Sequence, residues 1–132
     1  MAPVPRPVDK PRPVYLNLLA IRQPVPAIVS ILHRASGAAL FLVGLPLALW
    51  TLQASLGSPE GYQRVAAFFA HPLVKLVLIG LVWAYLHHLI AGVRHLLADI
   101  HIGLELASAR QSAAVTLVLG ILLTLAIAVK LW

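Results

Sequence analysis

The sequence predicts an all-α membrane protein with three transmembrane helices, its N-terminus in the cytoplasm and its C-terminus on the opposite side. Hydrophobic residues make up 61% of the 132 residues and charged residues only 11%. Polar side chains are therefore too few to cover the surface of a water-soluble domain of this size. Three apolar stretches are each long enough to cross a hydrocarbon core of about 30 Å as a helix.

The first 23 residues form a basic, proline-rich segment that we expect to be extended. Several prolines fall between Pro3 and Pro13, and the segment lacks the apolar core of a cleavable signal peptide. Such a segment stays exposed and poorly ordered unless a partner holds it. The transmembrane domain accordingly covers residues 24–132.

The first helix is predicted over about residues 24–56. Pro24 and Pro26 suit a helix start, where a missing N–H does no harm. Pro46 should kink the helix, which membrane helices tolerate. A turn cluster follows at residues 57–61, and a short interfacial helix carrying Tyr62, Phe68 and Phe69 is expected after it.

The second and third helices are predicted over about residues 72–98 and 112–131. Lys75 lies near the outer end of the second helix, where its long side chain can carry the charge to the interface. A polar connection containing Arg110 and Gln111 separates the two helices. The third helix ends with aromatic and basic residues at an interface.

The distribution of basic residues predicts the orientation in the membrane. The residues flanking the start of the first helix and the connection between the second and third are Arg6, Lys10, Arg12, Arg22, Arg34, Arg94 and Arg110. Only Arg64, Lys75 and Lys130 belong to the other side. Lysine and arginine accumulate in cytoplasmic loops, so the N-terminus is expected in the cytoplasm. This topology also explains the basic charge more simply than nucleic-acid binding would.

The second helix carries a stripe of polar residues. On a helix of 3.6 residues per turn, the positions i, i+4, i+7 and i+11 share one face, and here they hold His88, Gly92, His95 and Asp99. Polar groups inside a membrane span are costly, so the stripe is a candidate functional site. The glycine lets whatever the stripe faces come close to the backbone.

His88 lies roughly 10 Å inside the cytoplasmic boundary at 1.5 Å per residue, and four roles are open to it. It could be a structural histidine bonded to another helix, or part of a proton relay. A zinc or copper site has too few ligands, because the chain has no cysteine and no carboxylate lies nearby. It could also be an axial ligand to haem, whose flat apolar ring suits a helix bundle. His87 points about 100° away, so His88, on the glycine face, is the better ligand candidate.

A second polar stripe lies at the cytoplasmic entrance of the first helix, level with Arg94 and His95. It consists of Ser30, His33, Arg34 and Gly37 at i, i+3, i+4 and i+7. Cationic groups at this level could bind the propionates of a haem, although arginines at helix ends more commonly anchor the helix. A serine hydroxyl one turn from an arginine could also bind a quinone carbonyl, which becomes anionic on reduction.

Together these motifs resemble those of a known family. The matching segments are, in order, Arg12-Pro13-Val14, Ser30-Ile31-Leu32-His33-Arg34, Ser36-Gly37, Ser58-Pro59-Glu60-Gly61 and His88-x3-Gly92-x-Arg94-His95-x3-Asp99. Over nearly the whole chain the sequence resembles the cytochrome b membrane-anchor subunit of succinate dehydrogenase, respiratory complex II. One departure from the family pattern is His87, which gives two adjacent histidines.

The resemblance implies a role for each matching residue. His88 corresponds to an axial ligand of haem b, and Asp99 to an acid near the side of proton uptake. Ser30 and Arg34 correspond to residues of the quinone site. The residues expected around the haem propionates are His33, Arg34 and His95, with Arg94 added because of its level in the membrane.

The resemblance also implies partners. A second anchor subunit supplies the other axial histidine, an iron–sulfur subunit delivers electrons, and a flavoprotein subunit oxidises succinate. The chain would thus be a subunit of succinate:quinone oxidoreductase that passes electrons to ubiquinone or a related quinone. We expect it among the lipids of a bacterial inner membrane. One deep histidine fills only one axial position of a six-coordinate haem, so the chain should not be stable alone.

Two other functions remain open from the sequence. The chain could be a haem-free helical scaffold that anchors a soluble enzyme, with polar stripes that only bind neighbouring helices. It could also be a small proton- or ion-translocating subunit built on His88, His95 and Asp99. Three helices with no ionisable residue within the third span make a poor pathway on their own, which disfavours the second of these.

Overall fold

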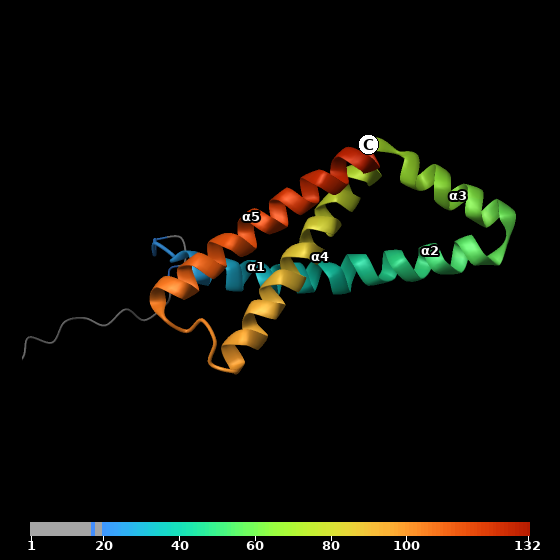
Figure 1. Ribbon diagram of the computed structural model, residues 1–132. Helices are drawn as coiled ribbons and strands as arrows, with labels where there is room; N and C mark the ends of the chain where they lie inside the picture. The colour runs from blue at the N-terminus through green and yellow to red at the C-terminus, as the bar shows by residue number, and fades with distance from the viewer. Residues whose placement is uncertain (1–16, 18–19) are drawn as a thin grey trace, which may run out of the picture.

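The computed structural model describes Asn17 and residues 20–132, and in this part of the chain helices are joined by short turns and loops, with no strand (Figure 1). The elements are α1 (Val25–Ala39), a π-helix η1 (Leu40–Gly44), α2 (Leu45–Gly57), α3 (Pro59–Ala70), α4 (Pro72–Asp99) and α5 (Leu106–Leu131). The stretches Val25–Gly57, Pro72–Asp99 and Leu106–Leu131 are long and apolar enough to cross a membrane. The predicted all-α class with three spans is therefore confirmed.

The predicted extended segment 1–23 lies outside the described residues, except for Asn17 and residues 20–23. The Arg12-Pro13-Val14 motif is therefore outside them too. The described chain enters α1 through Pro24, whose backbone is extended, with proline again in the first turn. Proline suits both positions because the first N–H groups of a helix have no partner within it.

The first span changes its winding just before Pro46. Leu45 N–H donates to Leu40 O, five residues back, which defines the π-turn of η1. Pro46 has no N–H, and its ring crowds the carbonyl of Leu42 in an ordinary α-turn. The wider turn relieves this crowding, so the distortion predicted at Pro46 takes the form of a π-helix.

The predicted short interfacial helix is α3, which folds back against α2. Ser58 caps it, because its hydroxyl accepts a hydrogen bond from Gly61 N–H at 3.0 Å. Hydrogen bonds from its own backbone N–H and from the Ser58 hydroxyl lower the pKa of the Glu60 carboxyl. A side chain at Gly61 would collide with the carbonyl oxygen of Ala54. The close approach of α3 to α2 therefore requires glycine at this position.

The third long helix begins earlier than predicted. α5 starts at Leu106 rather than at 112, so Arg110 and Gln111 are helical and not part of the connection. The predicted start was placed where the uncharged stretch begins, but a helix continues beyond the membrane boundary wherever water can solvate its polar side chains. The connection itself contains His101 and Gly103, both with left-handed backbone conformations, which end α4.

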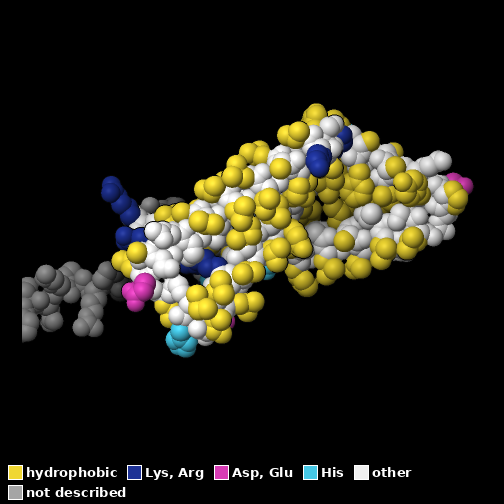
Figure 2. Space-filling model, in the orientation of Figure 1, with side chains coloured by type: hydrophobic (Ala, Val, Ile, Leu, Met, Phe, Trp, Pro, Cys, Tyr) yellow, Lys and Arg dark blue, Asp and Glu magenta, His cyan; other side chains and the backbone are white. Residues whose placement is uncertain are grey.

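The core lies where α4 packs between α1 and α5, and Figure 1 shows these three helices crossing. Its centre consists of Val29, Ala91 and Ala113, with Leu117 packed against them. Small residues at such crossings let membrane helices approach closely. Hydrophobic side chains dominate the visible surface, and charged groups gather mainly toward the ends (Figure 2). This surface suits contact with lipid tails or with other membrane helices.

Candidate functional site

Three of the histidines predicted for the site lie together between α1 and α4. The ring of His33 stacks on that of His88 at 4.1 Å between centroids and an interplanar angle of 14°. His95 tilts against His33 from the other side, at 5.0 Å. The two polar stripes thus face each other across the α1–α4 contact.

Hydrogen bonds to α1 orient the His88 ring. Its Nδ1 lies 3.0 Å from the carbonyl oxygen of His33 and 3.4 Å from the hydroxyl of Ser36. A carbonyl oxygen only accepts, so the proton of a neutral ring sits on Nδ1 and donates to it. Nε2 then keeps its lone pair and is the nitrogen available to a ligand or metal. A hydrogen bond of this kind is what orients metal-binding histidines in other proteins.

Gly37 makes room for this ring. A Cβ at Gly37 would lie 2.8 Å from Cε1 of His88, closer than a carbon–carbon contact allows. A Cβ at Gly92 would lie 3.6 Å from Nε2 of His33, which is an ordinary contact. The histidine rings therefore approach the backbone more closely at Gly37 than at Gly92. The sequence placed Ser36 and Gly37 in a motif, but it did not predict that either residue lies against the His88 ring.

His87 lies on a different face of α4 and is completely buried. Its Nε2 is 3.5 Å from the carbonyl oxygen of Val29, and its Nδ1 is buried without a partner among the described residues. If Nε2 donates to that carbonyl, the lone pair of His87 points into packed protein. Of the two adjacent histidines, His87 is fully enclosed, whereas His88 is only partly buried.

Ser30 and Arg34 lie next to each other on α1. Nε of Arg34 donates to the carbonyl oxygen of Ser30 at 3.3 Å, and the arginine is exposed. Ser30 lines a cavity of about 860 Å³ between α1, α4 and α5, together with Arg94 and His95. The site therefore combines a serine at the edge of a cavity with a guanidinium one turn away.

Within the described chain, the side chains of Arg94 and Asp99 make no ring or hydrogen-bond contact with the three clustered histidines, and Arg94 bonds to α5 instead. Nε of Arg94 donates to the Ser112 hydroxyl at 3.0 Å, and its Nη2 lies 3.4 Å from the carbonyl oxygen of Ala109. This arginine fastens α4 to α5, a contact that the sequence gave no reason to expect. Its role near haem propionates stays a prediction. Asp99 is exposed at the end of α4.

The described residues contain no group of three or more His, Cys, Asp and Glu side chains arranged to hold a metal ion. A metal bound at His88 would therefore need its other ligands from outside this chain. The porphyrin nitrogens of a haem and one residue of another subunit would supply them. The lone pair of Nε2 and the space left by Gly37 fit this role.

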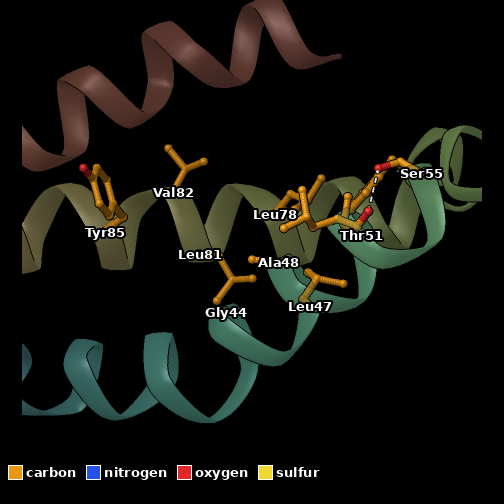
Figure 3. A pocket seen from close by; sticks show the side chains of 11 residues that line it. Gly44, Leu47, Ala48, Thr51, Ser55, Leu78, Leu81, Val82 and Tyr85 are labelled. Carbon is orange, nitrogen blue, oxygen red and sulfur yellow. Dashed lines mark hydrogen bonds between the residues drawn. The ribbon is translucent and has the colours of Figure 1, made fainter. Parts of the chain in front are cut away.

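A second cavity, of about 520 Å³, lies between α2 and α4 (Figure 3). Its lining is almost wholly apolar and includes Leu78, Leu81 and Val82. The hydroxyl of Thr51, which also lines it, has no hydrogen-bond partner among the described residues. None of the predicted site residues line this cavity.

Comparison with known proteins gives a consistent result. The family model of the succinate dehydrogenase/fumarate reductase transmembrane subunit matches residues 8–127. The succinate dehydrogenase cytochrome b556 subunit of Paracoccus denitrificans is 37% identical over 77% of this chain and 78% of its own length. The b556 subunit of Coxiella burnetii is 34% identical over 92% and 97%, and the mitochondrial b560 subunit of Sus scrofa 31% over 89% and 70%. The chain therefore belongs to the family of cytochrome b membrane-anchor subunits of succinate dehydrogenase, respiratory complex II.

Proposed function

We propose that this chain binds haem b through Nε2 of His88, shares it with a companion anchor subunit, and forms part of the site where quinone is reduced. The observation that carries the proposal is the hydrogen bond from His88 Nδ1 to the His33 carbonyl. It holds the ring in the tautomer and direction that an axial ligand needs. When bound, the haem would supply a one-electron carrier next to the quinone site.

The residues around His88 would then hold the edge of the haem. The ring of His33 contacts the rings of both His88 and His95. His33 or His95 could donate a hydrogen bond to a propionate, with Arg34 and Arg94 contributing positive charge at the same end of the helices. The buried carbonyl of His33 would hold the proton of His88 Nδ1 in place throughout.

Ser30 and Arg34 are proposed to bind the quinone. The Ser30 hydroxyl would donate a hydrogen bond to one quinone carbonyl. The guanidinium of Arg34, tethered by Nε to the Ser30 carbonyl, would place its remaining N–H groups where that oxygen gains negative charge. Electrons would come from the iron–sulfur subunit, which docks on the same side, while a flavoprotein subunit oxidises succinate. Asp99, exposed nearby, is proposed to take up protons.

The proposed orientation follows from the basic residues. Arg22 and Arg34 lie at one end of the first span and Arg110 near the same side, whereas Lys75 and Lys130 lie at the other. We therefore propose that the N-terminus faces the cytoplasm and that the complex resides in a bacterial inner membrane.

Haem binding is tested in the purified complex with His88→Ala. We expect the b-type absorbance in a reduced-minus-oxidised spectrum to disappear, because alanine has no nitrogen that can bind the iron. The control is His101→Asn, which removes an exposed histidine at a left-handed position that asparagine also adopts. Unchanged haem content in His88→Ala would refute His88 as the ligand, whereas a wild-type complex without b-type absorbance would favour a haem-free scaffold.

Quinone binding is tested with Ser30→Ala and Arg34→Gln. Both should lower succinate:quinone reductase activity by roughly 10²-fold, the typical cost of removing one donor to a developing oxyanion. Succinate oxidation with an artificial acceptor should persist, because that reaction does not use the quinone site. Equal loss of both activities would indicate a defect of assembly and would count against the assignment.

A further inference from the structure

His87 is the largest of the buried side chains on α4. Its side chain is completely buried, and Ala84 and Ala91, one turn away on either side along the same face, are buried as well. An imidazole is much larger than these alanine side chains. It is therefore the feature that the neighbouring helices must accommodate when α4 packs against them.

Three contacts surround His87. Nε2 lies 3.5 Å from the Val29 carbonyl oxygen on α1. The ring stacks on Trp83, one turn earlier on α4, at 5.2 Å and 21°. On α5, a Cβ at Gly120 would lie 3.8 Å from Cα of His87, so the backbone of α4 passes close to this glycine. His87 is thus held from α1, from its own helix and from α5.

The two adjacent histidines of α4 reach two carbonyls of α1 that are one turn apart. His87 approaches Val29 O and His88 approaches His33 O. The two side chains leave α4 about 100° apart, so both contacts form only at one rotation of α4 about its axis. Any rotation that releases His87 also turns the ring of His88.

We infer that His87 is a positioning residue, which fixes the rotation of α4 and thereby the direction in which His88 presents Nε2. This inference rests on the proposed haem ligation by His88. It gives the second histidine of the pair a function distinct from binding iron. It also places Gly120 beside the site, because α5 passes close to the backbone of His87 at this position.

The test uses purified complex with His87→Leu and His87→Gln. Leucine fills the space but cannot donate to Val29 O, whereas the amide nitrogen of glutamine can reach nearly the same position as Nε2. The measurements are the haem-to-flavin ratio, the midpoint potential, and the electron paramagnetic resonance g-values of the oxidised haem, which depend on the orientation of the axial imidazoles. We expect His87→Leu to keep its haem with shifted g-values and potential, and His87→Gln to resemble the wild type.

A second pair of variants acts on His87 from α5. Gly120→Ala adds a methyl group at ordinary contact distance and should leave the g-values unchanged, whereas Gly120→Val should shift them in the same direction as His87→Leu. This pair decides the matter if His87→Leu fails to assemble. Wild-type g-values and potential in His87→Leu, or in Gly120→Val, would overturn the inference.

The same measurements separate this inference from the proposed function. If His88→Ala loses its haem while His87→Leu is indistinguishable from the wild type, only the positioning role is wrong. If His87→Leu loses its haem and His88→Ala retains it, His87 is itself the ligand and both proposals fail.

Discussion

At the scale of single residues, the orientation of His88 depends on α1 more than on its own helix. The His33 carbonyl and the Ser36 hydroxyl both contact Nδ1, and the absent side chain of Gly37 leaves room for the ring. A histidine whose other ring nitrogen is held by a neighbouring helix loses little rotational freedom when it binds a ligand. The His88 ring that we propose as a haem ligand is therefore oriented by this chain alone.

Gly37→Ala tests this dependence. The new methyl group would lie 2.8 Å from Cε1 of His88, and overpacking of this kind costs about 1–3 kcal/mol. We expect haem affinity in the purified complex to fall roughly tenfold, measured as haem-to-flavin ratio during titration with a competing haem-binding protein. Gly92→Ala is the matched control, because its methyl group would meet His33 at only 3.6 Å. Equal losses in the two variants would contradict the inference that the missing side chain of Gly37 makes room for the His88 ring.

The residues of the site differ in how far the sequence could predict them. Helical periodicity alone predicted that His88 and His95 share a face of α4, and that His33 and Gly37 share a face of α1. This prediction needs only the 3.6 residues per turn of a helix. Periodicity could not say which residue of one helix meets which residue of the other. The bond of Arg94 to Ser112 and the burial of His87 depend on how two helices are rotated against each other, which a single sequence does not reveal.

At the scale of elements, α2 and α3 form a hairpin whose closeness depends on Gly61. Its Cα faces the carbonyl oxygen of Ala54, and a valine one turn later, Val65, is buried against α2. The sequence indicated a turn and an interfacial helix here from its glycine, proline and aromatic residues. The sequence also predicted a start of α5 that is too late. Hydropathy marks where the chain enters the apolar part of the membrane and not where the helix begins.

Gly61→Ala should open this hairpin. A Cβ there would collide with a backbone oxygen, which cannot move without displacing α2, so we expect a loss of about 1–3 kcal/mol in the free energy of unfolding. The measurement is chemical unfolding of the purified complex in detergent, followed by circular dichroism. Gly80→Ala, where an added Cβ meets nothing within 4 Å, should leave stability unchanged or slightly raise it. A loss in Gly80→Ala as large as in Gly61→Ala would refute the steric explanation.

At the scale of the whole molecule, the three spans bury little of one another. Large side chains such as Phe41, Leu42 and Leu56 are more than 60% exposed, and the centre of the core consists of three small or medium residues. We propose that a companion subunit completes the partly buried histidine cluster of this thin bundle. The number of spans could be predicted from the lengths of the apolar stretches. How little surface the helices bury against one another depends on how they cross, which the sequence did not predict.

Expression of this chain without its partners provides the corresponding test. Without the companion anchor we expect low accumulation in the membrane and no b-type spectrum. The chain alone supplies only one axial ligand, and its apolar face is not covered by the partner. Co-expression with the companion anchor alone should restore both, as measured by immunoblotting of a tag and by reduced-minus-oxidised difference spectra. A haem-containing, stable chain in the absence of any partner would contradict the shared site.

The π-turn at Leu40–Gly44 has a consequence for insertions and deletions in the gene. Loss of one codon within an α-helix turns every later side chain by about 100°, which would move protein-facing side chains of α2 out of their contacts. A π-turn contains one residue more than an α-turn needs. A single deletion within residues 40–44 can therefore be absorbed locally, provided that Pro46 is replaced at the same time so that the tighter turn is free of its ring. The first span thus contains one additional residue between the half that carries His33 and the half that folds into the hairpin.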